Sequence, residues 1–410
     1  MLNILTQMAK FVVSSAILNE NSRGVAVGLL RASKLSLFCT TLAFLRGSWL
    51  LKLFLFLCRE KVLTRALDSD FSGILRIFPK LAIIQKIPFL HCLGLRISAN
   101  DVCLDFDRRV SHLLDKGALV DANGVYVYAD QSYETIRAAK KRGLLIVYEL
   151  QIAYYKEIQS IISRENKKNN SWVESNHLYS DSDAGTRIDK ELSLVEHLVV
   201  ASSYTKRTLI KYGFGDKKIR VIPYGFPPAF HKDYLPLKGR KLRLLYVGSL
   251  GVTKGVRYLL DAVEGLEDKI DLTIVGSGNS SAALQEGILK HRYIESLPHA
   301  KVLEYMRESD LFVFPTLSDG FGMVIAEAMS QGTPVVTTPN SCGGDFIHQG
   351  YNGWLVPPSD SQAIRRRILE ILERPFLIEQ VGREAVKTAE LRPWSVYGEE
   401  IVDFVDSLKK

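Results

Sequence analysis

The second half of the chain repeats one pattern that limits its fold: an apolar run, a glycine-bearing loop and a helix-like segment. The strand-like runs are Leu242–Val247, Asp271–Val275, Leu311–Phe314 and Pro334–Thr337, and the helix-like segments are Val256–Glu264 and Met323–Ser330. Such alternation is typical of parallel α/β units. In an open α/β sheet, ligands bind where the strands end. We therefore expect an α/β fold with a binding site beside the glycine loops.

The first half shows the same alternation less regularly. Its predicted strands are Gly124–Tyr128, Leu144–Tyr148, His197–Ala201 and Ile219–Pro223, and its predicted helices are Tyr133–Lys141 and Tyr204–Lys211, the second with Ser202 and Ser203 as candidate caps. Residues Met1–Ala99 show no clean opening of strand, glycine loop and helix. The polar stretch Arg164–Asp189 predicts a flexible loop. The Pro/Gly-rich segment Tyr224–Pro228 marks a boundary between two domains.

Net charge and cysteine content limit the binding partners, metal sites and compartment that we expect. The net charge of +8 and the pI of about 9.0 favour phosphates, anionic lipids or nucleic acid. No long block of one charge is present, so we expect no nucleic-acid partner. The five cysteines are scattered without a CxxC pair, which indicates free thiols in a reducing compartment and no zinc site. The N-terminus lacks the pattern of a secretory signal.

One segment, Leu35–Cys58, approaches the length of a membrane span. Arg46, Gly47 and Lys52 interrupt it, so it is a poor spanning helix. Its basic and aromatic composition predicts an amphipathic helix, either buried in a core or lying on a lipid surface.

The strongest motif runs from Pro315 to Met329. Asp319 lies in a loop, and Glu327 lies just over one turn into the following helix. Gly320 and Gly322 leave the backbone open to a ligand, and the helix N-terminus favours anions and hydroxyl oxygens. Ionised carboxylates accept two hydroxyl donors, which suits the vicinal diols of a sugar or ribose. The alternative is an ordinary strand, loop and helix with a solvated Glu.

Two further glycine loops are weaker signals. In Val247–Gly255, Gly248 opens the backbone and Lys254 supplies a point charge suited to a diphosphate, although the spacing is not that of a P-loop. Gly276-Ser277-Gly278 follows the next strand. Each loop alone is also compatible with a plain turn, but three such loops along one sheet edge support each other.

These motifs together resemble the family 4 (group 1) retaining glycosyltransferases of GT-B fold. The resemblance is specific from about Val195 to Glu373. Its blocks are Ile222–Gly225, Val247-Gly248 with Lys254-Gly255, Gly276–Gly278, Asp319–Met329, Gly332–Val336 and Asn352–Val356. The segment around Trp394–Tyr397 is similar to the family's final helix.

The resemblance implies two Rossmann-like domains facing each other across a cleft. The acceptor-binding domain would span 1–225, the nucleotide-sugar domain 226–392, and a helix over 393–410 would return to the first domain. It also implies transfer of a sugar from a nucleotide-diphosphate sugar to a glycan or lipid-linked acceptor, with retention of configuration. Neither a metal nor another cofactor is expected.

The resemblance also implies roles for individual residues. Asp319 would contact the donor sugar, Glu327 would hold the ribose diol, and Lys254 would neutralise the departing diphosphate. The donor would lie along the backbone of Gly248, Ser249, Gly276, Gly278, Gly320, Phe321, Gly322, Met323 and Val324. The chain departs from the family pattern twice, because Asp319 replaces a Glu and Ser249 replaces a basic residue.

The acceptor would bind the first half of the chain. Candidates that follow predicted strand ends are Asp130, Tyr133, Glu149, Gln151, Tyr154 and Tyr155, although such residues also serve as caps and packing groups. No histidine is nominated. We expect a cytoplasmic protein, peripheral on the anionic inner face of a membrane. A non-catalytic nucleotide-sugar-binding or scaffold subunit is the competing interpretation.

Overall fold

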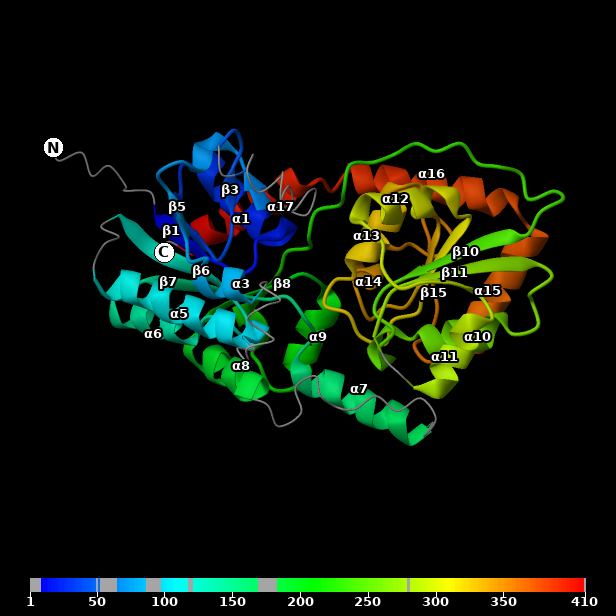
Figure 1. Ribbon diagram of the computed structural model, residues 1–410, viewed down its shortest axis with the longest axis horizontal. Coiled ribbons are helices and arrows are strands. Elements are labelled where there is room, and N and C mark those ends of the chain that lie inside the picture. Colours follow the sequence, from blue (N-terminus) through cyan, green and yellow to red (C-terminus); the bar gives the residue numbers. More distant parts are fainter. Residues whose placement is uncertain are drawn as a thin grey trace. The chain divides into compact units, whose positions relative to one another are not determined.

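The computed structural model describes residues 9–48, 51, 65–85, 97–116, 121–168, 183–278 and 281–408. The chain forms two compact units, each of which is described here by itself. Unit 1 comprises Met1–Leu150, Ser182–Val199 and Ser395–Lys410, and unit 2 comprises Gln151–Asp181 and Val200–Trp394. Figure 1 shows that each unit contains a sheet with helices packed against it.

The first sheet has the strand order β5-β2-β1-β6-β7-β8-β9. Its strands are β1 (Lys10–Ser14), β2 (Leu35–Thr40), β5 (Leu75–Ile77), β6 (Ala122–Tyr128), β7 (Leu145–Leu150), β8 (His197–Val200) and β9 (Ile219–Val221). The pairs β2–β5, β1–β2, β1–β6 and β6–β7 are parallel. The helices of unit 1 are α1 (Glu20–Arg31), α3 (Lys80–Ile84), α5 (Ala99–Asp115), α6 (Tyr133–Lys141), α8 (Asp183–Leu194) and α17 (Trp394–Ser407). Short elements are β3 (Phe44–Leu45), β4 (Ala66–Leu67) and the 3₁₀ turn η2 (Ser69–Phe71).

The second sheet is parallel throughout and has the order β12-β11-β10-β13-β14-β15. Its strands are β10 (Leu242–Val247), β11 (Ile270–Val275), β12 (Arg292–Ile294), β13 (Leu311–Phe314), β14 (Val335–Thr337) and β15 (Trp354–Leu355). The helices of unit 2 are α7 (Tyr155–Lys168), α9 (Ser203–Lys211), α10 (Val256–Val263), α11 (Ala282–Leu289), α12 (His299–Glu308), α13 (Met323–Ser330), α14 (Gly343–Phe346), α15 (Ser361–Glu373) and α16 (Phe376–Glu390). Two 3₁₀ turns are η4 (Asp216–Lys218) and η5 (Val252–Lys254).

The strands of unit 2 have the composition expected of a sheet covered on both faces. Every residue of β13 and β14 is buried, and β10 exposes only part of Arg243. Parallel sheets are covered by helices on both sides, so their strands are apolar throughout rather than alternating. This explains why the sequence pattern was clearest here: α13, β10 and β13 have the predicted bounds. The α/β prediction with parallel sheets is confirmed.

One prediction near the N-terminus is corrected. The segment predicted as an amphipathic helix, Leu35–Cys58, instead begins with strand β2 and continues into β3. A short apolar run that is buried on both faces fits a strand and a buried helix equally well by periodicity. Residues 49–50 and 52–58 lie outside the described part of the chain. An opening of strand, loop and helix also exists, as β1 and α1, with a loop that contains no glycine.

The flexible loop predicted for Arg164–Asp189 is wrong at both ends. Helix α7 continues to Lys168 and helix α8 begins at Asp183, while residues 169–182 lie outside the described chain. Polar composition suggested a loop, but each helix has buried positions at helical spacing, such as Ile161, Ile162 and Glu165 on α7. Burial of one face therefore stabilises each helix, although the segment is polar on average.

Candidate active site

Lys254 and Asp319 meet at the carboxyl edge of the second sheet. The Lys254 ammonium donates to Asp319, with 2.5 Å between Nζ and Oδ2. Their side chains are only 24% and 20% exposed, so the pair is partly shielded from water. A partly buried ion pair is stronger than an exposed one because screening by solvent is weaker.

Backbone contacts between two loops bring this pair together. The carbonyl of Thr253, next to Lys254, accepts hydrogen bonds from Leu317 N at 2.7 Å, Ser318 N at 3.1 Å and Thr316 Oγ1 at 3.0 Å. Asp319 N donates to the Asn340 carbonyl at 3.0 Å. The turn η5 and the loop after β13 are thus fastened to each other, and their charged side chains meet as a result.

The loop around Gly320 has room only for glycine. A Cβ on Gly320 would lie 2.0 Å from the carbonyl oxygen of Gln151. The Gly320 carbonyl accepts from Ser202 Oγ at 2.5 Å and Thr205 Oγ1 at 3.1 Å, both at the start of α9. Ser202 caps α9, as the sequence predicts, and the same hydroxyl also holds the site loop.

Gly322 begins the helix that carries the rest of the motif. It is the N-cap of α13 and has a φ of 84°, in the left-handed region that favours glycine. The backbone N–H groups of Met323 and Val324 project from the N-terminal end of α13 and have no partner within the helix. They form an anion-attracting helix end beside Lys254 and Asp319.

A cavity of about 330 Å³ opens at this place. Its lining includes seven predicted site residues: Gly248, Lys254, Asp319, Phe321, Gly322, Met323 and Val324. Gln151, Tyr224 and Phe314 complete the lining. Gln151 was predicted as an acceptor-side residue, and Tyr224 as part of a family block. The cavity is lined by a cation, a carboxylate, a helix N-terminus and aromatic rings.

Five predicted donor residues lie outside this lining: Ser249, Gly276, Gly278, Gly320 and Glu327. Gly276, Gly278 and Ser249 follow strands β10 and β11 at the same sheet edge. The Ser249 carbonyl accepts from the Tyr246 hydroxyl at 2.7 Å, and Leu250 N donates to the Ser277 carbonyl at 2.9 Å. The first contact is local to the loop after β10, and the second joins the two glycine loops.

Glu327 also lies outside the lining, and its side chain is paired with a histidine. His299 Nε2, on the first residue of α12, lies 3.0 Å from Glu327 Oε1. The Glu327 side chain is 12% exposed and that of His299 is 63% exposed. Sequence analysis missed His299 because it is isolated in the sequence. The only available signal was its position after Pro298, at the start of a helix.

Two acceptor-side candidates lie at the end of β6 in unit 1. Asp130 has a φ of 64°, and its Oδ1 lies 3.4 Å from Arg187 Nε. Burial raises the pKa of the Asp130 carboxyl, and the Arg187 charge opposes that shift. Tyr133 begins α6, with the Arg137 guanidinium 5.7 Å from its ring centre.

Glu149, the third candidate, is fully buried in unit 1. Its carboxylate accepts from Tyr126 Oη at 2.6 Å, Asn21 Nδ2 at 3.1 Å and Tyr397 Oη at 3.0 Å. The side chain therefore joins β6, α1 and α17 within this unit. Tyr154 is buried in unit 2, where it packs against Tyr155, Tyr212 and Phe214.

The described residues contain neither a metal-binding cluster nor a membrane-spanning helix. No group of three or more His, Cys, Asp or Glu side chains in this part of the chain is placed to hold a metal ion. Among the described helices, none has both the length and the apolar character needed to cross a membrane.

Part of the chain matches a family of known proteins. Residues 241–374 match the family model described as glycosyl transferases group 1. An uncharacterized glycosyltransferase of Methanocaldococcus jannaschii is 28% identical over 204 residues, covering 48% of this chain and 56% of that protein. Phosphatidyl-myo-inositol mannosyltransferase of Mycobacterium leprae is 32% identical over 159 residues, covering 36% and 42%. The chain thus spans about half the length of these curated relatives.

The fold extends the likeness over nearly the whole chain. The structure of Anabaena Alr3699/HepE in complex with UDP and glucose superposes with a TM-score of 0.62, covering 97% of this chain and 100% of that chain at 15% identity. The fold is therefore that of the GT-B glycosyltransferases. The family match supports a group 1 glycosyltransferase, and it covers the segment that carries Lys254, Asp319 and Glu327.

Proposed function

We propose that the protein transfers a sugar from a nucleoside-diphosphate sugar to an acceptor, with retention of configuration and without a bound metal. The observation that carries the proposal is the Lys254–Asp319 pair beside the open N-terminus of α13, in a cavity at the carboxyl edge of the sheet. This arrangement combines a cation for a diphosphate with a carboxylate for sugar hydroxyls.

The chemistry requires stabilisation of the departing diphosphate. Negative charge grows on the leaving group as the bond to the sugar breaks. The Lys254 ammonium and the amides of Met323 and Val324 are already oriented, so they stabilise that charge without reorganisation. Glu327 holds the ribose diol, with its orientation fixed by His299. Asp319 accepts from hydroxyls of the donor sugar.

The acceptor in this proposal is a glycan or a lipid-linked sugar, bound by unit 1 on an anionic membrane surface. One matched relative is named for a phosphatidyl-inositol substrate, which supports a lipid acceptor. Flotation with anionic liposomes at low salt tests the surface interaction. The membrane proposal is wrong if the protein does not float with them at low salt, where electrostatic binding is strongest.

Release of nucleoside diphosphate from a panel of nucleotide sugars tests the proposed transfer. Slow hydrolysis, or transfer to an acceptor, should occur with at least one donor and should disappear in Asp319→Ala and Lys254→Ala. Lys241→Ala is the control, since this lysine of unit 2 does not line the site cavity. Its rate should stay normal.

A non-catalytic binding subunit is the second candidate. It is favoured by Asp319, which is one methylene shorter than the family's Glu and is already paired with Lys254. This candidate predicts stabilisation by a nucleotide sugar, roughly 2.7 kcal/mol at about 100 times the Kd, without turnover of any donor. Turnover that depends on Asp319 excludes it.

A further inference from the structure

Both loops that carry the Lys254–Asp319 pair contact one segment from the first half of the sequence. At its start, the Gln151 carbonyl and Ile152 pack directly against Gly320, next to Asp319. The segment continues as helix α7, which contacts the turn η5 that ends in Lys254. All of these residues belong to unit 2.

Glu165 anchors the far end of α7. Its side chain is only 5% exposed. The Tyr258 hydroxyl donates to one carboxylate oxygen, and Ser359 Oγ donates to the other at 3.2 Å. Lys168 lies at 3.4 Å and Arg164 at 3.7 Å from that second oxygen. A buried carboxylate is stable only when paired and hydrogen-bonded, and Glu165 meets both conditions.

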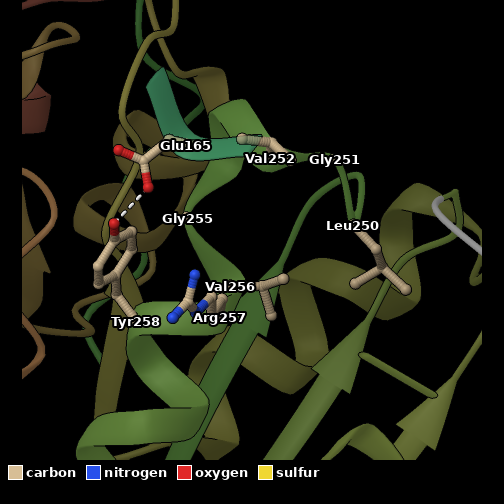
Figure 2. Close-up of a pocket in the computed structure, with 8 residues that line it drawn as sticks. All are labelled: Glu165, Leu250, Gly251, Val252, Gly255, Val256, Arg257 and Tyr258. Carbon is tan, nitrogen blue, oxygen red and sulfur yellow. Dashed lines mark hydrogen bonds between the residues drawn. The ribbon is translucent and has the colours of Figure 1, made fainter. Parts of the chain in front are cut away.

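The contact between Glu165 and Tyr258 lies next to the turn that carries Lys254. Tyr258 is on the first turn of α10, three residues after its N-cap, Gly255. Figure 2 shows the hydrogen bond between Glu165 and Tyr258 at one side of a small cavity whose lining also includes Leu250, Gly251 and Val252. The cavity measures about 20 Å³, so the helix and the turn are closely packed. Glu165 therefore fixes the start of α10 and the adjoining turn.

Through Ser359, Glu165 also contacts the loop before α15. Ser359 is a non-glycine residue with a φ of 61°, in the left-handed region that side chains seldom adopt. Such a conformation persists when surrounding contacts hold it in place. Its hydroxyl donates to Glu165, so the carboxylate joins α7, α10 and the loop before α15.

We infer that Glu165 is a positioning residue for the donor site, acting through Tyr258 and the Val252–Gly255 turn to place Lys254. The inference rests on the proposed function for its catalytic consequence. It also means that donor binding depends on residues outside the matched segment 241–374. The continuous segment 151–168 contacts both charged loops: its start packs against Gly320, and helix α7 contacts the turn that ends in Lys254.

Substitutions at Glu165 in the full-length chain test the inference. Glu165→Ala should weaken binding of UDP, ADP or GDP, whichever the wild type binds, on the order of tenfold, because misplaced binding groups lose much of their effect. Glu165→Gln retains an acceptor for Tyr258 and Ser359, and should recover most of the affinity. Glu157→Ala is the matched control, since Glu157 anchors α7 to Lys211 and Tyr212 away from the turn.

Hydrogen exchange of the unliganded protein gives a second readout that needs no nucleotide. Amides of residues 250–256 should exchange faster in Glu165→Ala and in Tyr258→Phe. The double variant should be no worse than the more severe single variant, because the two groups act through one contact. Glu157→Ala should leave these amides unchanged.

The outcomes separate the inference from the proposed function. If wild type binds no nucleoside diphosphate but exchange at 250–256 responds as described, the proposed function fails and the positioning contact stands. If Glu165→Ala and Glu157→Ala have equal effects on exchange and affinity, Glu165 serves only the stability of α7 and the inference is wrong.

Discussion

The loops that follow the strands differ in composition between the two units. In unit 2, the loops after β10, β11 and β13 contain glycines and pack backbone against backbone. In unit 1, the loops after β1 and β6 contain no glycine, and buried side chains fill the same edge. Two fully buried carboxylates, Glu149 and Glu191, accept the hydrogen bonds there.

The difference shows how one architecture supports two kinds of surface. A glycine edge exposes backbone amides and admits a ligand with many oxygens, such as a diphosphate. An edge held by buried carboxylates has fixed loops, because the Asp130 and Ser132 amides both donate to Glu191. The side chains on those loops then determine what binds.

The largest effect is expected for Lys254→Ala in unit 2. Loss of one group that stabilises the leaving diphosphate should reduce kcat/KM by about 1000-fold, or about 4 kcal/mol. Steady-state kinetics with the active donor measure it. A reduction below tenfold would show that the α13 amides suffice, and that the cation is dispensable.

Glu149→Ala should cost unit 1 about 3 kcal/mol of stability. It leaves the hydroxyls of Tyr126 and Tyr397 and the amide of Asn21 without this acceptor in a buried place. Hydrogen exchange under mild denaturant resolves the two units and measures the loss in β6, α1 and α17. If Glu149→Gln keeps full stability yet raises the acceptor KM, Glu149 contacts the acceptor, as the sequence predicts.

Gly320→Ala tests the glycine edge of unit 2, with an expected cost of about 2 to 3 kcal/mol. The new methyl group would meet the Gln151 carbonyl at 2.0 Å, so the loop must move. Nucleotide affinity should fall together with stability, because Asp319 is the neighbouring residue. Gly215→Ala is the control, since this glycine of unit 2 also has no positive φ and nothing lies within 4 Å of its Cβ. Normal nucleotide binding by Gly320→Ala would contradict the role given to this loop.

The smallest effect is a pH dependence in unit 1. Burial raises the pKa of Glu191 from 4.5 to about 7, against the lowering effect of its three hydrogen bonds. Between these values the folded state holds a proton that the unfolded state has lost, so stability falls as pH rises from about 4.5 to 7. The expected change is about 2 kcal/mol between pH 5 and 7. Exchange in β6 and α6 measures it, and Glu191→Gln should abolish the slope.

Unit 2 should respond in the opposite direction. Burial lowers the pKa of the Lys232 ammonium from 10.5 to about 7, Asp310 opposes the shift, and Arg243 and Arg240 add to it. Between these values the unfolded state binds the extra proton, so stability rises as pH increases from about 7 to 10.5. Lys232→Met should remove this rise. If the stability of both units changes with pH in the same direction, the contrast drawn between them is wrong.

Sequence analysis described unit 2 better than unit 1 for a physical reason. Strands β10 and β13 and helix α13 have distinct apolar periods and end at glycines, which are visible without knowledge of contacts. In unit 1, Glu149 joins β6, α1 and α17, and Glu191 holds the loop after β6. Their partners lie 23 to 248 and 43 to 61 residues away in sequence. No local pattern predicts such pairs. Strand β2 was misassigned for another reason: it is buried on both faces, so its pattern also fits a buried helix.

The sequence by itself determined the α/β class, the parallel strands of unit 2, and the identity of seven residues around the cavity. Those features depend on local propensity and on glycine positions, which are properties of short segments. Only the tertiary structure decided that Lys254 pairs with Asp319 and that His299 pairs with Glu327. It also brought Glu165, from the first half of the sequence, against Tyr258 beside the turn that carries Lys254. Each of these pairs joins residues at least 28 positions apart, and only the packing of whole helices and strands brings such residues together.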